Sequence, residues 1–187
     1  MEPVVSLAAM DQLAQGIDHA EGICMTPDGT IWVSGEKGQI YRVDADGRAT
    51  EATTTGGWTL GLAADGAGRI YACDPNHRTV YRWTPGGGAP EPWSTGVPGR
   101  PFLCPNWGAF APDGSFYVTD SGGWKTRDGA ILVVRRGETS LWTDEGRDFP
   151  NGCAVSPDRR ELWVLESTPG AIVAYEIRPD GSAGRRR

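Results

Sequence analysis

Residues 149–158 read FPNGCAVSPD, and residues 161–167 read ELWVLES. This stretch contains a polar residue, a short apolar run, a Pro-Asp turn and a second apolar run that ends in a carboxylate. Two apolar runs of this length on either side of such a turn predict a β-hairpin. The same pattern occurs at 21–33 and 106–120. It also occurs at 60–74, where the polar residues stand at different positions within the pattern. The chain is therefore built from a repeated hairpin.

The glycine near the start of each copy marks the length of the repeat. Gly22, Gly61, Gly108 and Gly152 are separated by 39, 47 and 44 residues. Repeats of about 40–50 residues made of short strands predict an all-β fold, the β-propeller, with one four-stranded blade per repeat. We expect a single partial propeller domain, 1–187, with blades at about 21–55, 58–94, 106–143 and 151–187. In the first blade we expect strands at 22–26, 31–34, 39–43 and 49–54. A different all-β fold is the alternative.

Closure of the ring is the open question. The fourth blade has a third strand at 171–177 and a turn at 178–181, and the chain ends where its fourth strand is expected to begin. Val4–Ala9 could form a strand that pairs with the last blade, since closure hides sheet edges. Either four blades close on themselves, or the chain is an open fragment of a larger ring. We favour the fragment, which would expose an apolar blade face and self-associate through its open edge.

Composition excludes several partners. The chain has 27 Gly and 14 Pro, which suit turns and strands, and a net charge of −6 without a basic patch. These features argue against nucleic-acid binding. We see no signal peptide and no membrane span. The four cysteines lack a CxxC pairing, which indicates free thiols and a cytoplasmic location rather than zinc or disulfides.

The expected topology gathers oxygen-bearing side chains at one end of the blades. In each blade the first strand begins, and the antiparallel second strand ends, on the same face. Glu21, Asn106 and Asn151 open three of the first strands, and their carboxylate and amide oxygens suit a hard cation such as calcium. The alternative is that both asparagines simply cap the turns that begin their strands.

At these residues the chain resembles the gluconolactonase and regucalcin (senescence marker protein) family. The resemblance rests on Glu21-Gly22, on Asn106 before Pro112-Asp113-Gly114, on Pro150-Asn151-Gly152 and on DSGGWK at 120–125. It implies a six-bladed propeller with a divalent metal, commonly calcium, and hydrolysis of sugar lactones or related esters. It also implies that Glu21, Asn106 and Asn151 are metal ligands.

Two departures from the family concern the site. The family supplies a further aspartate ligand, its usual general base, in an Asp-Gly pair that lies beyond the last residue of this chain. Well-studied sugar lactonases also carry an arginine where this sequence has Cys104. The missing aspartate bears on whether this chain is active, and the missing arginine bears on its substrate.

Other candidate residues are expected at the same end of the blades. Asp120 ends a second strand and is the nearest stand-in for the catalytic base, although it could instead cap its own loop. Trp107 and Trp124 could form an apolar wall for a substrate. Trp32 and Trp163 are expected in the core between blades. The alternatives to a lactonase are a non-catalytic propeller that binds a small ligand or a protein, and an inactive truncated product.

Overall fold

The computed structural model describes residues 9–187, which form four four-stranded antiparallel sheets and one two-stranded hairpin. Sheet 1 contains β1 (Ile23–Met25), β2 (Ile31–Ser34), β3 (Gln39–Val43) and β4 (Ala49–Thr54). Sheet 2 contains β5 (Leu62–Ala64), β6 (Ile70–Asp74), β7 (Thr79–Trp83) and β8 (Glu91–Ser94). Sheet 3 contains β11 (Pro105–Phe110), β12 (Phe116–Asp120), β13 (Ala130–Arg135) and β14 (Glu138–Thr143). Sheet 4 contains β15 (Pro150–Val155), β16 (Glu161–Glu166), β17 (Ala171–Ile177) and β18 (Ala183–Arg186). The hairpin pairs β9 (Gly96–Val97) with β10 (Arg100–Pro101).

The turns explain why the hairpins form where the sequence predicts them. In each repeated turn an aspartate side chain accepts a hydrogen bond from the backbone N–H two residues later, which stabilises the reversal locally. The pairs are Asp28 with Thr30, Asp65 with Ala67, Asp113 with Ser115, Asp158 with Arg160 and Asp180 with Ser182. Gly29 and Gly114 follow two of these aspartates with φ of 83° and 85°, a region that glycine enters without a steric penalty.

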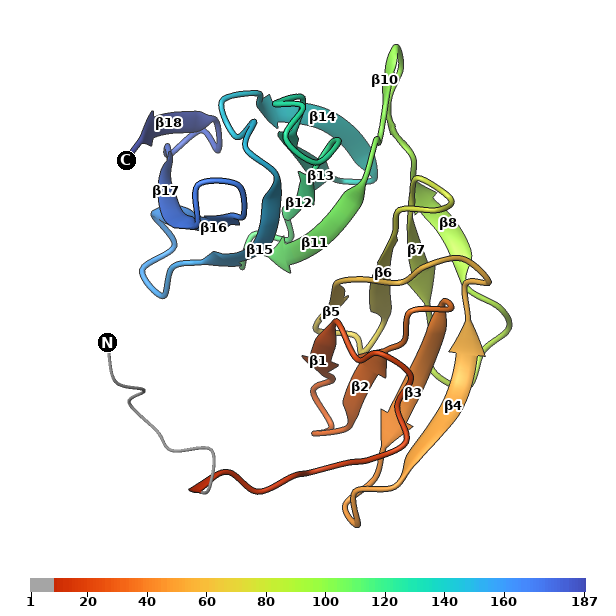
Figure 1. Ribbon diagram of the computed structural model, residues 1–187. Coiled ribbons are helices and arrows are strands. Elements are labelled where there is room, and N and C mark those ends of the chain that lie inside the picture. The colour runs from red at the N-terminus through yellow and green to blue at the C-terminus, as the bar shows by residue number, and fades with distance from the viewer. Residues whose placement is uncertain (1–8) are drawn as a thin grey trace.

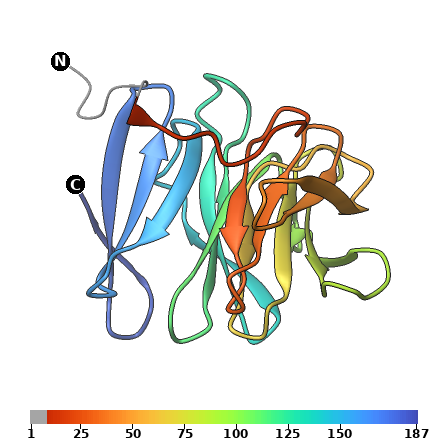
Figure 2. The ribbon, with the colours of Figure 1, turned by 90° about the horizontal axis from the view of Figure 1, so that it is seen from below.

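The four sheets are arranged as propeller blades. Strands follow one another in sequence order within each sheet, and the first strands, β1, β5, β11 and β15, contact one another in series. Figure 1 shows the sheets around an arc that is open between sheet 1 and sheet 4, and Figure 2 shows them side by side. The predicted β-propeller is confirmed, as an open arc. Within residues 9–187, no strand of sheet 1 pairs with a strand of sheet 4.

The core formed by residues 9–187 consists of three layers, each between two neighbouring sheets. Strand β12 shows how alternation produces this arrangement. Phe116 and Val118 pack toward sheet 2, whereas Tyr117 lies in the cluster shared with sheet 4. Trp32 packs edge-on against Trp83 at 5.3 Å in the layer between sheets 1 and 2, as expected for a core tryptophan. Period-2 side-chain alternation thus lets one strand contribute to two cores.

Sheet 4 differs from the prediction in two respects. It has a fourth strand, β18, where the chain was expected to stop before one. Trp163 is 43% exposed rather than buried in a core, because no other sheet within residues 9–187 packs on that face. Leu165 and Ile172 are exposed beside it, Ile172 by 76%. The strand expected at Val4–Ala9 lies almost wholly outside the described residues.

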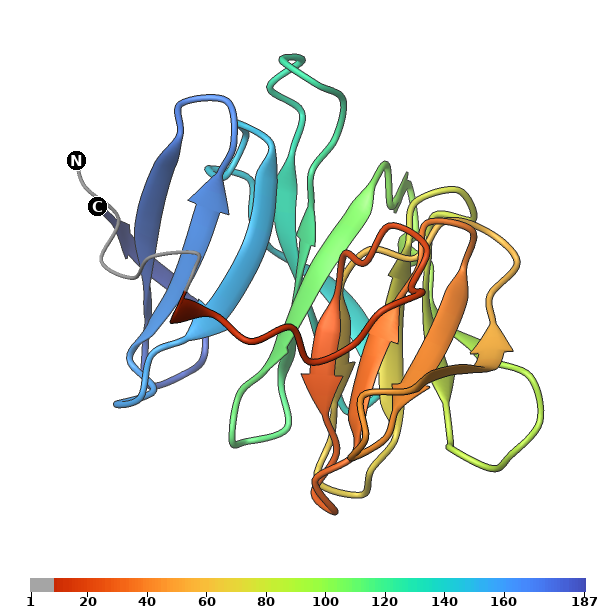
Figure 3. The same ribbon diagram turned by 60° about the horizontal axis from the view of Figure 1, so that its bottom comes forward.

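The N-terminal segment, residues 9–20, partly covers the face of sheet 1 that points away from sheet 2. A parallel bridge joins Gln15 to Arg48, and the backbone N–H of Glu36 donates to the carbonyl of Asp18. Figure 3 shows the segment, in red, extending from sheet 1 across the open side of the arc. Ile23 and Met25 on β1 are 58% and 65% exposed. No helix in residues 9–187 is long and apolar enough to cross a membrane.

Candidate functional site

One end of the arc carries the starts of the first strands, and we call this end the mouth. In sheet 3, Pro105 at the start of β11 pairs with Asp120 at the end of β12. In sheet 4, Pro150 pairs with Glu166 in the same way. The backbone N–H of Ser34, at the end of β2, donates to the carbonyl of Gly22 at 2.9 Å. Each first strand therefore begins beside the end of its second strand, as the antiparallel topology predicts.

Hydrogen bonds between sheets hold the mouth together. The Ser34 hydroxyl donates to the Leu60 carbonyl at 2.6 Å, and the Gly61 N–H donates to the Asn106 carbonyl at 2.8 Å. The Thr119 hydroxyl donates to the Asn151 carbonyl at 2.6 Å. Asn106 and Asn151 thus have backbones fixed by the preceding sheet. The sequence pattern predicts no role for these hydroxyl groups, although a serine or threonine recurs near the end of the second strand.

The side chains of the three predicted ligands have oxygens without partners among residues 9–187. Asn106 is 5% exposed, and its amide makes no hydrogen bond to a described residue. Asn151 donates from Nδ2 to the Ser167 hydroxyl at 3.2 Å, which leaves its Oδ1 available. Glu21 is exposed, and its carboxylate forms no ion pair within the described residues. Among residues 9–187, the one fully buried side-chain nitrogen or oxygen without a hydrogen-bond partner is Trp58 Nε1. The Asn106 amide therefore still reaches solvent at the mouth and is free to contact a ligand.

The donor set fits a hard cation. One carboxylate and two amide oxygens are the ligand types that calcium prefers, and six to eight ligands are usual, so other ligands must complete the shell. In the described part of the chain, no three His, Cys, Asp or Glu residues are arranged to hold a metal. A metal at the mouth would therefore depend on the asparagines rather than on a carboxylate or thiolate cluster.

Three carboxylates that end second strands lie at the mouth, and all three are fully buried. Asp74 accepts hydrogen bonds from the Thr55 hydroxyl and from the N–H groups of Trp58 and His77. Glu166 accepts from the Tyr175 hydroxyl at 2.9 Å and pairs with Arg186 at 2.7 Å. These two carboxylates therefore have structural partners.

Asp120, the candidate base, is bound in a similar way. Its Oδ1 accepts from the N–H groups of Leu103 and Cys104, at 3.1 and 2.6 Å. Burial raises the pKa of Asp120, and these two hydrogen bonds oppose the rise only in part. The side chain ties the residues before β11 to the end of β12. The backbone held in this way leads directly into β11, which carries Asn106 two residues after Cys104.

The predicted substrate-binding tryptophans occupy separate places. Trp107 is half-buried and lines an open apolar cavity of about 370 Å³ on sheet 4, together with Cys153, Trp163 and Ile172. Trp124 is 58% exposed in the loop after β12 and stacks edge-on against Phe149 at 5.0 Å. Trp124 is not among the residues that line the Trp107 cavity.

Cys104 stands where the resemblance implies an arginine. The side chain is partly buried, and burial raises the pKa of its thiol to about 11. The thiol is therefore neutral at physiological pH and cannot supply the positive charge of an arginine. Any substrate recognition at this mouth would have to use other groups.

A comparison with known protein families identifies the family of this chain. The sequence profile described as SMP-30/Gluconolactonase/LRE-like region matches residues 19–187. The chain belongs to the SMP-30/gluconolactonase/LRE-like family. A search of curated protein sequences found no significant match.

Solved structures show the same fold at low sequence identity. A gluconolactonase from Xanthomonas campestris has a TM-score of 0.82 and 23% identity over 94% of this SMP-30/gluconolactonase-family chain. A candidate gluconolactonase has a TM-score of 0.80 and 22% identity over 95% of the chain. A virginiamycin B lyase from Staphylococcus aureus has a TM-score of 0.70 and 17% identity over 90%. The chain spans 63%, 65% and 55% of the lengths of these three proteins.

Proposed function

We propose that this chain carries the metal-binding part of a calcium-dependent hydrolase of sugar lactones or related esters. The observation that carries the proposal is the Asn106 side chain, which is only 5% exposed, has an amide without a hydrogen bond to any described residue, and lies near the start of an inner strand at the mouth. Membership of the SMP-30/gluconolactonase/LRE-like family supports a lactonase-like activity. Glu21, Asn106 and Asn151 are the proposed ligands.

The proposed mechanism separates the role of the ion from that of the chain. Calcium bound at the mouth would polarise the lactone carbonyl and stabilise the oxyanion that forms when water adds to it. The chain would hold the three oxygen donors in place. Asn106 and Asn151 can do so because hydrogen bonds between sheets fix their carbonyls, and fixed supporting groups preserve ligand geometry.

The surroundings of the site would contribute binding rather than proton transfer. Trp107 follows Asn106 and offers an apolar surface to the carbon skeleton of a substrate. Asp120 would support Asn106 through the chain at Leu103 and Cys104. We assign no general base among the described residues.

Calcium binding can be measured apart from catalysis. We expect saturating calcium to raise the melting temperature of the chain, by about 5–10 °C at a concentration a hundredfold above Kd. Asn151→Ala and Asn106→Ala should abolish the rise, whereas Asn76→Ala, which changes an exposed loop asparagine, should keep it. A melting temperature that calcium leaves unchanged, or that rises equally in all three variants, would contradict the site.

The reaction needs its own assay. Hydrolysis of an aldonolactone, followed by acid release at constant pH, should be faster with calcium than with a chelator. Equal rates in both conditions would remove the metal from the mechanism. Calcium binding without any hydrolysis would favour a non-catalytic binding protein instead.

We also propose a cytoplasmic location. All four cysteines are free. Burial raises the pKa of the thiols of Cys24 and Cys153 to about 12, so these groups stay protonated and unreactive. Free cysteines in this number are usual in a reducing compartment.

A further inference from the structure

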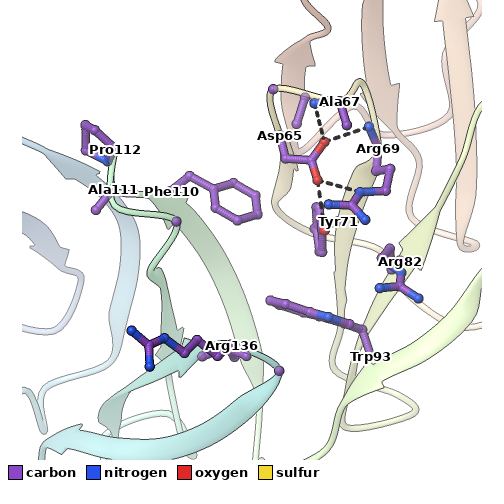
Figure 4. A pocket seen from close by; sticks show the side chains of 15 residues that line it. Asp65, Ala67, Arg69, Tyr71, Arg82, Trp93, Phe110, Ala111, Pro112 and Arg136 are labelled. Atoms are coloured by element: carbon purple, nitrogen blue, oxygen red, sulfur yellow. Dashed lines mark hydrogen bonds and ion pairs between the residues drawn. The ribbon is translucent and has the colours of Figure 1, made fainter.

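A second cavity lies at the end of the blades opposite the mouth, between sheets 2 and 3. Its volume is about 570 Å³, within the range of small-molecule sites. The turns that follow β5 and β11 form part of its rim, together with Arg136 and Gly137 after β13. These turns are at the far ends of strands that begin at the mouth, so the cavity is separate from the proposed metal site. All the residues that line the cavity are within the described part of the chain, and Figure 4 shows their side chains.

Aromatic rings form one side of this cavity. The Tyr71 ring lies 4.6 Å from Trp93 and 4.9 Å from Phe110, in both cases nearly edge-on. Phe116, fully buried, packs against Phe110 at 4.5 Å and against Trp93 at 5.5 Å. Trp93 and Phe110 are half-buried and border the open space in Figure 4. The rings are thus held by one another while Trp93 and Phe110 keep surface for a ligand.

The charged residues of the cavity are mainly basic. Arg69, Arg82 and Arg136 line it, against one carboxylate, Asp65. The Asp65 carboxylate accepts hydrogen bonds from the Arg69 Nε at 2.7 Å, the Tyr71 hydroxyl at 3.0 Å and the N–H groups of Ala67 and Arg69. Asp65 is therefore saturated, while Arg69 uses only Nε and keeps its terminal nitrogens. A surplus of two positive charges on this lining contrasts with a chain whose net charge is −6.

The other two arginines differ in their pairing. Arg82 contacts Glu91 at 2.5 Å, and Glu91 is itself 62% exposed outside the cavity lining. The Arg136 side chain forms no ion pair or hydrogen bond with any described residue. Arginine binds carboxylates through two parallel N–H groups, and a rim arginine without a partner is available for such a contact.

We propose that this cavity binds a small aromatic carboxylate, with the ring against Trp93 and Phe110 and the carboxylate held by the arginines. The aromatic side favours a planar apolar group, and the positive lining favours a single anionic group at its edge. An extended polyanion fits less well, because the chain as a whole is acidic, with a net charge of −6. The proposal does not depend on the metal site at the mouth.

The first experiment is isothermal titration calorimetry of the chain with 2-naphthoate. Two control ligands separate charge from ring: 2-naphthamide keeps the ring and removes the charge, whereas cyclohexanecarboxylate keeps the charge and removes the ring. We expect both to bind up to about tenfold more weakly than 2-naphthoate, since a hydrogen bond to a charged group is worth about tenfold or more and an aromatic contact is worth up to about tenfold. Naphthamide binding as well as naphthoate would overturn the proposal, as would no binding of naphthoate.

Matched variants then locate the site. Arg136→Gln should weaken naphthoate binding about tenfold. Arg159→Gln is the control, since Arg159 is also exposed, has a φ of 65° against 52° for Arg136, and lines a different cavity. Glu91→Gln should tighten binding about twofold, because it releases Arg82. Equal affinities of the Arg136→Gln and Arg159→Gln variants would overturn the proposal.

Discussion

At the scale of the residue, glycine sets the distance between neighbouring inner strands. A Cβ atom added to Gly61 would lie 2.7 Å from the carbonyl oxygen of Asn106 and 2.8 Å from the Cα of Trp107. Both obstacles are backbone atoms, which cannot move aside without shifting sheet 3. A Cβ atom on Gly152 would meet nothing within 4 Å. Two glycines at the same place in the repeat therefore face different constraints.

We expect Gly61→Ala to lower the free energy of unfolding by about 1–3 kcal/mol, because the methyl group overpacks a close contact. Gly152→Ala should leave stability nearly unchanged. Urea unfolding of both variants, followed by circular dichroism, measures the difference. Similar midpoints for the two variants would show that the inner strands can separate without cost.

At the scale of the element, Asp120 connects the residues before β11 to the end of β12. Burial raises the pKa of Asp120 in the folded chain above its usual value near 3.8. Between that value and the raised pKa, the folded state binds more protons than the unfolded state. The free energy of unfolding contributed by this group therefore falls as pH rises through this window.

Asp120→Asn should remove this pH dependence. The asparagine Oδ1 can still accept from Leu103 and Cys104, as the aspartate Oδ1 does, so the fold and calcium binding should persist. Unfolding in urea at a series of pH values from about 4 upward tests this, with Asp46→Asn, an exposed turn variant, as the control. An unchanged pH slope would contradict a raised pKa of Asp120, and a loss of lactone hydrolysis in a stable variant would favour a catalytic Asp120.

The elements themselves could be predicted because their signals are local. The strands at 31–34, 39–43 and 49–54 have the predicted bounds. Aspartate turns and period-2 alternation act within one hairpin, so the sequence of that hairpin contains them. The hydroxyl groups of Ser34 and Thr119 link different sheets, and their partners become visible only in three dimensions. The burial of Trp163 was predicted wrongly for the same reason, because it depends on whether a neighbouring sheet packs against this residue.

The candidate site was only partly predictable. Placing Glu21, Asn106 and Asn151 at one end of the blades required only strand direction. The partners of Asp120 could not be read from the sequence, because they are backbone N–H groups. Likewise, Tyr71, Trp93, Phe110 and Arg136 come from different strands and turns of two sheets.

At the scale of the whole molecule, the two ends of the arc expose apolar surface. Trp163, Leu165 and Ile172 lie on sheet 4, and Ile23 and Met25 lie on sheet 1. We expect this chain to self-associate at micromolar concentration, because contiguous exposed apolar patches favour burial against another surface. Sedimentation velocity over a range of concentrations measures the association.

Ile172→Lys should shift the chain toward the monomer, because it places a charge on that face. Leu141→Lys provides the control, since Leu141 is 44% exposed on the outermost strand of sheet 3. A chain that stays monomeric without substitution, or one that responds equally to both, would contradict association through sheet 4.

The layered core has a wider consequence for how such a chain can change in length. Every apolar cluster is shared by two adjacent sheets, so a further repeat placed beyond sheet 4 would cover Trp163 and Ile172 and leave the three existing clusters intact. Duplication of a whole repeat therefore costs the older repeats little, and the architecture can grow by modules without redesign of its interior.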